Sequence, residues 1–424
     1  MTTQLNVGFL KREKFKLSVE EDYMHIVGLI AEYNPFHKGH QYQLQKIREN
    51  FPESSLVVVM SGNVVQRGEF AILNKWQRAQ LAMEHGVDLV VELPLWASLQ
   101  SADYFAYWAV DLLARMQVDH LVFGSYDTST QQFNRALKWM SQNEQDLDIN
   151  MKGFLQRGYA YPAAMQAAID ALDPEHRHIT FNMSEGNSLL GYHYLRVNQG
   201  LKDSMSYSVI KRSPNFLSGT QIRQAVRDQL LSTEMVPKAS YRYLTESVNV
   251  SWHNYFPFIQ YKLLTMTPAE LSKIQGMREG FENRLLKVIN QVDTFDEFLS
   301  QLTSKRWAKS SVQRLLMMVL VNISQDDWQE AIERYQEKAY VRILACNDNG
   351  RDIISQTNQS HKQIYLFSNL TQDIYDHYQW IIQVDKIYQL GHKEIAEQNI
   401  GKFPIFCTKA DNAFYILTID CKLK

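Results

Sequence analysis

Two histidines set in a strand-to-helix passage are the residues most able to do chemistry. In "IVGLIAEYNPFHKGHQYQLQKI", residues 26 to 47, an apolar run stops at Pro35, and His37 and His40 flank Gly39 where helical spacing resumes. A helix that starts there aims unpaired backbone N–H groups and its positive dipole end at one point, which attracts phosphate. Two imidazoles three residues apart share a helix face and can donate hydrogen bonds to phosphoryl oxygens. Gly39, without a Cβ, would let a flat base approach the backbone.

This pattern predicts a cradle for a nucleoside triphosphate. The alternative is a pair of solvated or structural histidines, or zinc ligands, although no further zinc ligands can be placed. The strand-turn-helix setting favours the phosphate interpretation over the short motif taken alone.

A second candidate lies in "SGTQIR", residues 218 to 223, with Lys211 and Arg212 just upstream. Ser218 and Thr220 in front of a helix can cap its N-terminus and touch phosphate oxygens, while Arg223 can hold the β- and γ-phosphates. An ordinary helix cap with a surface arginine would explain this piece alone. Two such pieces in one domain favour a shared nucleotide site.

A third cluster, "SKRWAKSSVQR", places Lys305, Arg306, Lys309 and Arg314 around Trp307. Basic side chains neutralise nucleic-acid phosphates, and an aromatic face can stack on an unpaired base. The alternative is a solvated helix start with Trp307 in the core, and the residues alone favour it. For Gln66 and Arg67, a phosphate or RNA role and plain turn formation are equally compatible with the sequence.

The elements that must position these residues alternate along the first part of the chain. Short β-branched runs at 26–32, 56–60, 87–93, 119–123 and 205–210 predict buried strands. Helical spacing at 38–50, 74–85, 103–116, 133–143, 152–172 and 187–198 predicts the helices between them. Such alternation predicts a doubly wound α/β fold with a parallel sheet, whose ligands lie outside the carboxyl ends of the strands.

The remainder of the chain falls into two regions that differ in their sequence pattern. Helical periodicity dominates residues 240–330, "SSVQRLLMMVLVNI" reads as a core helix, and residues 331–424 mix helices with the strand-like pieces YVRILAC, QIYLF and YILTI. We therefore expect an extension at 1–25, a nucleotide-binding domain at 26–235, a helical domain at 240–330 that is a candidate for nucleic-acid binding, and a mixed α/β region at 331–424.

Charge and cysteine usage bound the class of protein. The formal net charge is −2, so any nucleic-acid surface has to be a local patch. Three widely spaced cysteines fit neither a disulfide framework nor a zinc site, and a reducing cytoplasm is expected. Without a long apolar run we expect no membrane association. We also expect no DNA partner and no protein-bound metal.

Taken together, the motifs resemble a known family. H-x-G-H after the first strand and S-x-T-x-I-R after the last are similar to the nucleotidylyltransferase superfamily. More specifically, "VGLIAEYNPFHKGH", "MSGNVVQRGEFAILNKWQRA", "GVDLVVELP", "FGS", "GNSLLGYHYL" and "IKR" resemble, in order and spacing, the bacterial tRNA(Met) cytidine acetate ligases. "EGFENRLL" and "SKRWAKSSVQRLL" extend the similarity into the helical region.

The resemblance implies an ATP-dependent ligase that makes acetyl-adenylate from acetate and ATP. The acetyl group then passes to N4 of the wobble cytidine of elongator tRNA(Met), giving N4-acetylcytidine, with Mg²⁺ expected on the phosphates. His37 and His40 would be catalytic, and the tRNA would contact Lys305, Arg306, Lys309 and Arg314. Carried over by position or read from the second motif, the nucleotide site would comprise Ile30, Ala31, Glu32, Tyr33, Asn34, Pro35, Phe36, His37, Lys38, Gly39, His40, Gln41, Tyr42, Gln43, Gly124, Asn187, Arg212, Ser218, Thr220 and Arg223.

The sequence departs from the family pattern at several positions. Lys38 stands where the family has Asn, Tyr126 and Asp127 follow Gly124-Ser125 where an acidic residue is expected directly, Gly186 replaces Asn, and His193 replaces an acidic residue. These changes bear on the positioning of the adenosine and on the geometry of the second step. Two other functions are compatible with the motifs: an adenylyltransferase acting on a small phosphorylated metabolite, and a non-enzymatic nucleotide-sensing RNA-binding protein.

Overall fold

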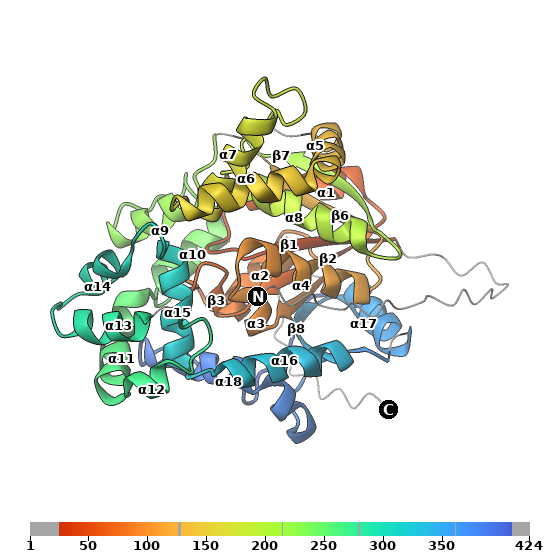
Figure 1. Ribbon diagram of the computed structural model, residues 1–424. Helices are drawn as coiled ribbons and strands as arrows, with labels where there is room; N and C mark the ends of the chain where they lie inside the picture. The colour runs from red at the N-terminus through yellow and green to blue at the C-terminus, as the bar shows by residue number, and fades with distance from the viewer. Residues whose placement is uncertain (1–24, 126–128, 214, 279, 361, 409–424) are drawn as a thin grey trace.

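A single sheet forms the centre of the computed structural model, which describes residues 25–125, 129–213, 215–278, 280–360 and 362–408. Eight strands of this described part are joined in the order β10-β8-β5-β2-β1-β6-β7, with β9 also paired to β8 (Figure 1). Their bounds are β1 Ile26–Ala31, β2 Ser55–Ser61, β5 Leu89–Leu93, β6 His120–Ser125, β7 Ser206–Lys211, β8 Ala339–Cys346, β9 Ile364–Phe367 and β10 Ile405–Phe406.

The five strands expected from the sequence are confirmed and run parallel to one another. The chain builds outward from β1 through β2 to β5, then returns to place β6 on the other side of β1. Strand order therefore reverses between β1 and β6, where open α/β sheets bind their ligands. The H-x-G-H motif follows β1 and Gly124 lies in β6, so both lie at this reversal.

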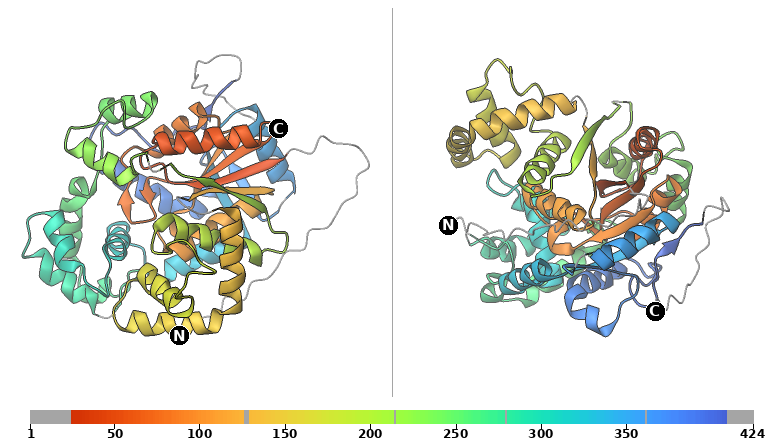
Figure 2. Two further views of the ribbon diagram at one scale, coloured as in Figure 1. Left: turned by 90° about the horizontal axis from the view of Figure 1, so that it is seen from above. Right: turned by 90° about the vertical axis from the view of Figure 1, so that its right-hand side faces the viewer.

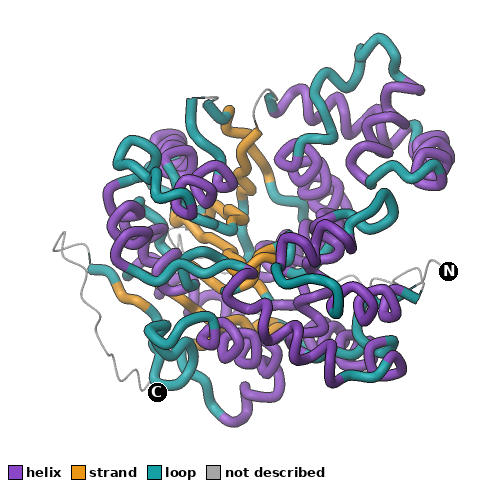
Figure 3. Tube along the Cα trace, turned by 90° about the vertical axis from the view of Figure 1, so that its left-hand side faces the viewer, coloured by secondary structure: helices purple, strands orange, loops and turns teal. Residues whose placement is uncertain are grey.

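Side-chain alternation along the strands supplies both faces of the sheet with apolar groups, and helices cover both (Figures 2 and 3). Leu56 and Val58 of β2 pack in a cluster with α1 and α2, while Val57 and Val59 pack in a second cluster with α3, α4 and α8. These helices are α1 Lys38–Asn50, α2 Lys75–Glu84, α3 Leu95–Ser98, α4 Ala102–Arg115 and α8 Gly186–Gly200.

One expected helix is wrong. Residues 152–172 form not one helix but the end of α6 and all of α7, in a segment that also holds α5 (α5 Thr130–Gln142, α6 Glu144–Gln156, α7 Tyr161–Leu172). Gly158, at φ 88°, ends α6 in the left-handed conformation that favours glycine, and Pro162 lies in the first turn of α7. The apolar spacing continues across the break, which is why periodicity alone missed it.

Short helices follow in the next part of the chain: α9 Gly219–Arg227, α10 Lys238–Glu246, α11 Trp252–Thr265, α12 Pro268–Leu271, α13 Phe281–Ile289, α14 Phe295–Leu302, α15 Lys309–Val321 and α16 Gln325–Glu337. The expected core helix is α15, which is buried over most of its length. Its backbone lies against the hairpin of β3 (Val64–Val65) and β4 (Glu69–Phe70). A Cβ on Gly68, at φ 73°, would fall 2.4 Å from the Arg314 backbone nitrogen. The Trp252 indole donates to the Gly68 carbonyl oxygen over 2.8 Å.

The C-terminal part joins the same sheet. β8 pairs antiparallel with β5, while α17 (Asp348–Ser360) and α18 (Gln372–Leu390) pack beside it. The strand-like pieces YVRILAC and QIYLF are β8 and β9, and YILTI lies outside the described residues. The Lys75 ammonium, fully buried, lies 2.8 Å from a Glu92 carboxylate oxygen and 2.6 Å from one of Asp385 in α18. Within the described residues, no helix combines the length and apolar character needed to cross a bilayer.

Candidate active site

One cleft, about 1080 Å³ in volume, opens beyond the carboxyl ends of β1 and β6. It is lined by residues that are far apart in the sequence, from the β1–α1 passage to the start of α15. The expected site residues on its wall are Ile30, Ala31, Glu32, Tyr33, Asn34, His37, Gly39, His40, Gln43, Gly124, Asn187, Arg212, Ser218, Thr220, Arg223, Lys305, Arg306 and Arg314. The candidate nucleotide and tRNA residues therefore meet in one cavity.

Six expected residues do not line this cleft: Pro35, Phe36, Lys38, Gln41, Tyr42 and Lys309. Phe36 is fully buried against Tyr33 and His40. The Lys38 ammonium points to Glu234 at 3.8 Å. Apart from Lys309, these residues belong to the β1–α1 passage or to α1, and their expected contact with a nucleotide stays a prediction. The expected contact of Lys309 with tRNA also stays a prediction.

The two histidines cap helix α1 reciprocally. His37 is the N-cap, and its Nδ1 accepts the backbone N–H of His40 over 3.3 Å, while His40 Nδ1 accepts the backbone N–H of His37 over 3.2 Å. The imidazole planes are stacked, with ring centroids 3.6 Å apart. The two imidazoles thus occupy both positions of a capping box. Ser or Thr is usual at the first position and Glu or Gln at the second.

This arrangement sets the protonation of both rings. Burial, together with the positive charge of Arg212, lowers the pKa of His37 to about 3. Burial, the neighbouring His37 and Arg212 also lower the pKa of His40 well below its usual value. Because each Nδ1 accepts a backbone proton, each neutral ring carries its own proton on Nε2. At neutral pH the motif presents two uncharged N–H donors, which suit the oxygens of a phosphoryl group.

Arg212 adds the positive charge at the same place. It follows β7, and its side chain passes so close to β6 that a Cβ on Gly124 would lie 3.2 Å from Arg212 Cγ. A Cβ on Gly39 would lie 2.9 Å from His37 Cε1 and 3.8 Å from an Arg212 guanidinium nitrogen. Gly39 is thus explained by the packing of His37, which differs from the reason expected from the sequence.

The start of helix α9 lies against the β1–α1 passage, since a Cβ on Gly219 would fall 2.8 Å from the Asn34 carbonyl oxygen. Ser218 caps the helix and Gln221 completes the capping box, so the ordinary cap is present. Arg223 donates to the Asn34 carbonyl oxygen over 2.6 Å and pairs with Glu69 at 3.0 Å. The guanidinium therefore ties α9 to the β1–α1 passage and lines the cleft at the same time.

A buried arginine that sequence reasoning did not single out holds the strand ends. Arg78 in α2 is fully buried and donates to the carbonyl oxygens of Glu32, Ser61, Gly62 and Leu73. Burial lowers its pKa to about 10, so the guanidinium stays charged at neutral pH. The ends of β1 and β2 are thereby fixed beside the cleft.

Four cationic residues line the cleft and are called the basic wall below: Arg278, Lys305, Arg306 and Arg314. Trp307 is in the core, which is the alternative that the residues alone favoured. It is 6% exposed and stacks on Phe281 with ring centroids 3.9 Å apart. The prediction that Trp307 stacks on an unpaired base is therefore wrong. Burial lowers the pKa of Arg314 to about 10.

Several wall residues were missed by sequence reasoning. Residues Leu155, Gly158, Tyr159, Tyr161 and Pro162 come from the α6–α7 connection. Their signal was the "RGYAYP" turn chemistry inside an apparently continuous helix. Gln66 and Arg67, for which two roles were open, line the cleft and also lie in the turn between β3 and β4, where the Gly68 N–H donates to the Val65 carbonyl oxygen over 2.9 Å.

The departures from the family pattern are placed as follows. Gly186 opens α8, and a Cβ there would approach an Arg67 guanidinium nitrogen at 3.4 Å. His193 is buried beside Tyr161 and Tyr192, and burial lowers its pKa to about 4. Tyr126 and Asp127 lie outside the described residues.

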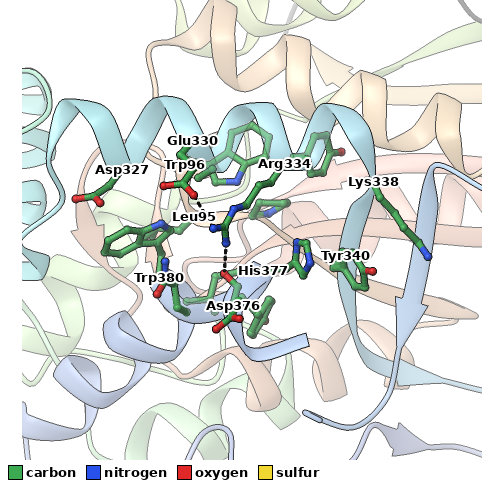
Figure 4. Close-up of a pocket in the computed structure, with 16 residues that line it drawn as sticks. Leu95, Trp96, Asp327, Glu330, Arg334, Lys338, Tyr340, Asp376, His377 and Trp380 are labelled. Atoms are coloured by element: carbon green, nitrogen blue, oxygen red, sulfur yellow. Dashed lines mark hydrogen bonds and ion pairs between the residues drawn. The ribbon is translucent and has the colours of Figure 1, made fainter. Parts of the chain in front are cut away.

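A second cavity is far smaller. It has a volume of about 40 Å³ and lies between α3, α16, β8 and α18 (Figure 4). Arg334 fills part of it, pairing with Glu330 at 2.5 Å and donating to the Asp376 carbonyl oxygen over 3.3 Å. No group of three or more His, Cys, Asp or Glu suited to a metal ion occurs in the described residues. The large cleft is therefore the candidate active site.

Comparison with known proteins agrees with this geometry. A family model described as HIGH Nucleotidyl Transferase matches residues 24–402. The chain is 34% identical over 403 residues to the tRNA(Met) cytidine acetate ligase of Ligilactobacillus salivarius, covering 90% of this chain and 100% of that protein. The corresponding protein of Anoxybacillus flavithermus is 32% identical over 389 residues, covering 87% and 93%.

A solved structure is similar over the same extent. Thermotoga maritima TmcAL bound with alpha-thio ATP matches with a TM-score of 0.78 and 25% identity, covering 91% of this chain and 100% of that one. The resemblance drawn from the motifs is confirmed, as is the nucleotidyltransferase fold, whose parallel-dominant sheet carries flanking helices. The chain belongs to the tRNA(Met) cytidine acetate ligase family of HIGH nucleotidyl transferases.

Proposed function

We propose that this protein is an ATP-dependent acetate ligase that acetylates N4 of the wobble cytidine of elongator tRNA(Met), giving N4-acetylcytidine. The observation that carries the proposal is the shared cleft. The capping histidines and Arg212 line the same cavity as Lys305, Arg306 and Arg314. A nucleotide cradle and a basic wall in one cavity suit an enzyme that activates a small acid and then passes it to a polyanion. The names of the relatives agree with this assignment.

In the first step an acetate oxygen would attack the α-phosphorus of ATP. A new P–O bond forms, the bond to the β-phosphate bridging oxygen breaks, and pyrophosphate leaves with that electron pair. Negative charge spreads over the phosphoryl oxygens, so donors held in place supply most of the help. The two Nε2–H groups and Arg212 are donors of this kind.

In the second step the N4 amine of the cytidine would attack the acetyl carbonyl carbon. An amide bond forms, AMP leaves, and the amine gives up a proton. The target base has to leave its stack to reach the adenylate, which fits recognition of a single-stranded loop. The cations across the cleft would then hold the RNA backbone.

We also propose that Mg²⁺ accompanies ATP rather than occupying a site built by the protein. Of the described acids on the cleft wall, Asp103 accepts from the Ser101 hydroxyl, Glu69 pairs with Arg223, and Glu32 accepts the Gln66 backbone N–H over 2.7 Å. Burial raises the pKa of Glu32, which makes it a poorer magnesium ligand. The triphosphate would supply most of the charge that holds the ion. A cytoplasmic location follows from the proposed tRNA substrate.

Acetate-dependent exchange of labelled pyrophosphate into ATP tests the first step, and transfer of labelled acetyl to tRNA tests the second. We expect exchange that requires acetate but not tRNA. Absence of exchange from folded protein contradicts the proposal. A dinucleotide product from ATP and a phosphorylated metabolite would instead indicate an adenylyltransferase. ATP that is bound but stays intact with acetate and tRNA present would indicate a nucleotide sensor.

A further inference from the structure

The wall of the cleft holds one tyrosine whose exposure differs from that of its neighbours. Its described Tyr and Phe side chains are Tyr33, Phe105, Phe123, Tyr159, Tyr161 and Tyr194. Tyr33, Phe105, Phe123 and Tyr194 are at most 6% exposed and belong to the core, and Tyr161 is partly buried. Tyr159 is 47% exposed. Of these six rings, that of Tyr159 offers the most surface to a ligand.

Local backbone chemistry fixes this ring at the rim. At the end of α6 the Gly158 N–H donates to the Leu155 carbonyl oxygen over 2.9 Å, and the Tyr159 N–H donates to the Phe154 carbonyl oxygen over 3.1 Å. This is the paired hydrogen bonding of a Schellman helix end, with glycine at the left-handed position. The accompanying apolar contact is present too, since the Phe154 and Tyr159 ring centroids lie 5.4 Å apart at 60°. The tyrosine is therefore positioned before any ligand arrives.

A cation from the other wall lies against the same turn. A Cβ on Gly158 would meet Cβ and Cδ of Lys305 at 3.5 Å each, so the aliphatic part of Lys305 packs on the helix end. Lys305 belongs to the basic wall with Arg278 and Arg306. An exposed aromatic face beside a basic wall is the combination that binds single-stranded nucleic acid, through base stacking and phosphate neutralisation.

We propose that Tyr159 and Lys305 form a subsite that receives an unpaired pyrimidine of the RNA substrate, with the base stacked on Tyr159 and a flanking phosphate at Lys305. The inference rests on the proposed function and adds a place for the base that accepts the acetyl group. It assigns to Tyr159 the stacking role for which Trp307 is unsuited, because Trp307 is buried against Phe281. Tyr159 is a binding residue for the second step alone.

The first test separates the two steps in three variants. Tyr159→Ala is expected to keep acetate-dependent pyrophosphate exchange and to lower kcat/KM for acetyl transfer to tRNA about tenfold or more, the size of a lost base stack. Tyr159→Phe should transfer at the wild-type rate. Tyr159→Leu, which keeps an apolar contact with Phe154 but has no aromatic face, should be as impaired as the alanine variant.

Tyr104 provides a matched control, because it is 46% exposed on α4 and does not line the cleft. Tyr104→Ala should leave both steps unchanged. Wild-type transfer by Tyr159→Ala or by Tyr159→Leu overturns the subsite. Absence of exchange in the wild-type protein instead contradicts the proposed function, so the two failures are distinct.

A binding cycle tests the base contact directly. The probe is an RNA hairpin with the anticodon arm of elongator tRNA(Met), intact or with an abasic nucleotide at the wobble position. Wild-type protein should lose affinity for the abasic hairpin, and Tyr159→Ala should bind both hairpins equally weakly. An equal loss caused by the abasic nucleotide in both proteins would mean that the base does not contact Tyr159, and would overturn the inference.

Discussion

At the residue scale, each histidine of the motif has a structural role, and we propose a chemical role for each as well. Nδ1 of each ring holds the helix start, which leaves Nε2–H for a substrate. The same chain shows how to separate the two parts, because Ser129 with Gln132 and Ser218 with Gln221 make the same reciprocal cap without an imidazole. Glutamine at position 40 should therefore preserve the cap while replacing the rigid ring Nε2–H by an amide N–H on a flexible side chain.

His40→Gln is expected to fold with wild-type stability and to lower acetate-dependent pyrophosphate exchange, because its amide N–H is not held where the ring N–H lies. His40→Ala, which has no donor, should lower exchange about 100-fold or more and also lose about 1 kcal/mol of stability through the cap. Exchange rates and urea unfolding measure the two effects. Wild-type turnover by His40→Ala would exclude the chemical role.

The low pKa of His37 predicts a dependence of stability on pH. In the unfolded chain a histidine takes up a proton near pH 6.5, whereas folded His37 stays neutral down to about pH 3. The unfolded state therefore binds more protons in this window, so the contribution is fully present above pH 6.5 and is lost as the pH falls. The slope for one group approaches about 1.4 kcal/mol per pH unit.

His37→Asn retains an N-cap acceptor but cannot titrate. Between pH 6.5 and pH 5 its free energy of unfolding should fall less than that of the wild-type protein, as measured by urea denaturation at each pH. Parallel pH profiles for the two proteins would show that His37 titrates normally in the fold.

At the element scale, the strands and helices around the sheet follow from apolar periodicity because each carries its buried face in the sequence. Two features were not predicted from the sequence. The break at Gly158 leaves the periodicity intact, and only the Gly and Pro positions signal it. The cleft walls come from segments that are distant in sequence, so no local pattern could show that Tyr159 and Lys305 touch the same turn.

The roles of the basic wall can be tested by position. Lys305→Ala with Arg306→Ala should weaken tRNA binding and make the plot of log K against log salt shallower by about one unit or more, since each lost phosphate contact reduces the slope. Lys287→Ala is the control, because Lys287 is exposed on α13 and does not line the cleft. Equal salt slopes for wild-type and double-variant proteins would argue against phosphate contacts at these residues.

At the scale of the whole molecule, the C-terminal part contributes strands to the same sheet as the first part of the chain. The sequence predicted a mixed α/β composition there, but antiparallel addition of β8 beside β5 depends on pairing between strands some 250 residues apart, which composition does not encode. The buried Lys75–Glu92–Asp385 group fastens α18 to the same sheet.

Asp385→Ala should destabilise the protein by about 3 kcal/mol, because it removes one partner from a buried charge group. Tryptophan fluorescence and far-ultraviolet circular dichroism during urea unfolding should still give one coincident transition. Asp376→Ala, at an exposed position on α18, should change stability by less than about 0.5 kcal/mol. Separate transitions for the two probes would indicate that the C-terminal part unfolds on its own.

The contact between Gly68 and the backbone of α15 has a consequence for reading mutational data. Position 68 needs a positive φ and leaves no room for a Cβ, yet Gly68 is not on the cleft wall. In a library of all single variants selected for growth, substitutions of Gly68 would be tolerated as poorly as substitutions of the two histidines. Loss of growth caused by a substitution at Gly68 would reflect disrupted packing between the hairpin and α15. Only assays on purified variants can distinguish this effect from a loss of catalytic activity.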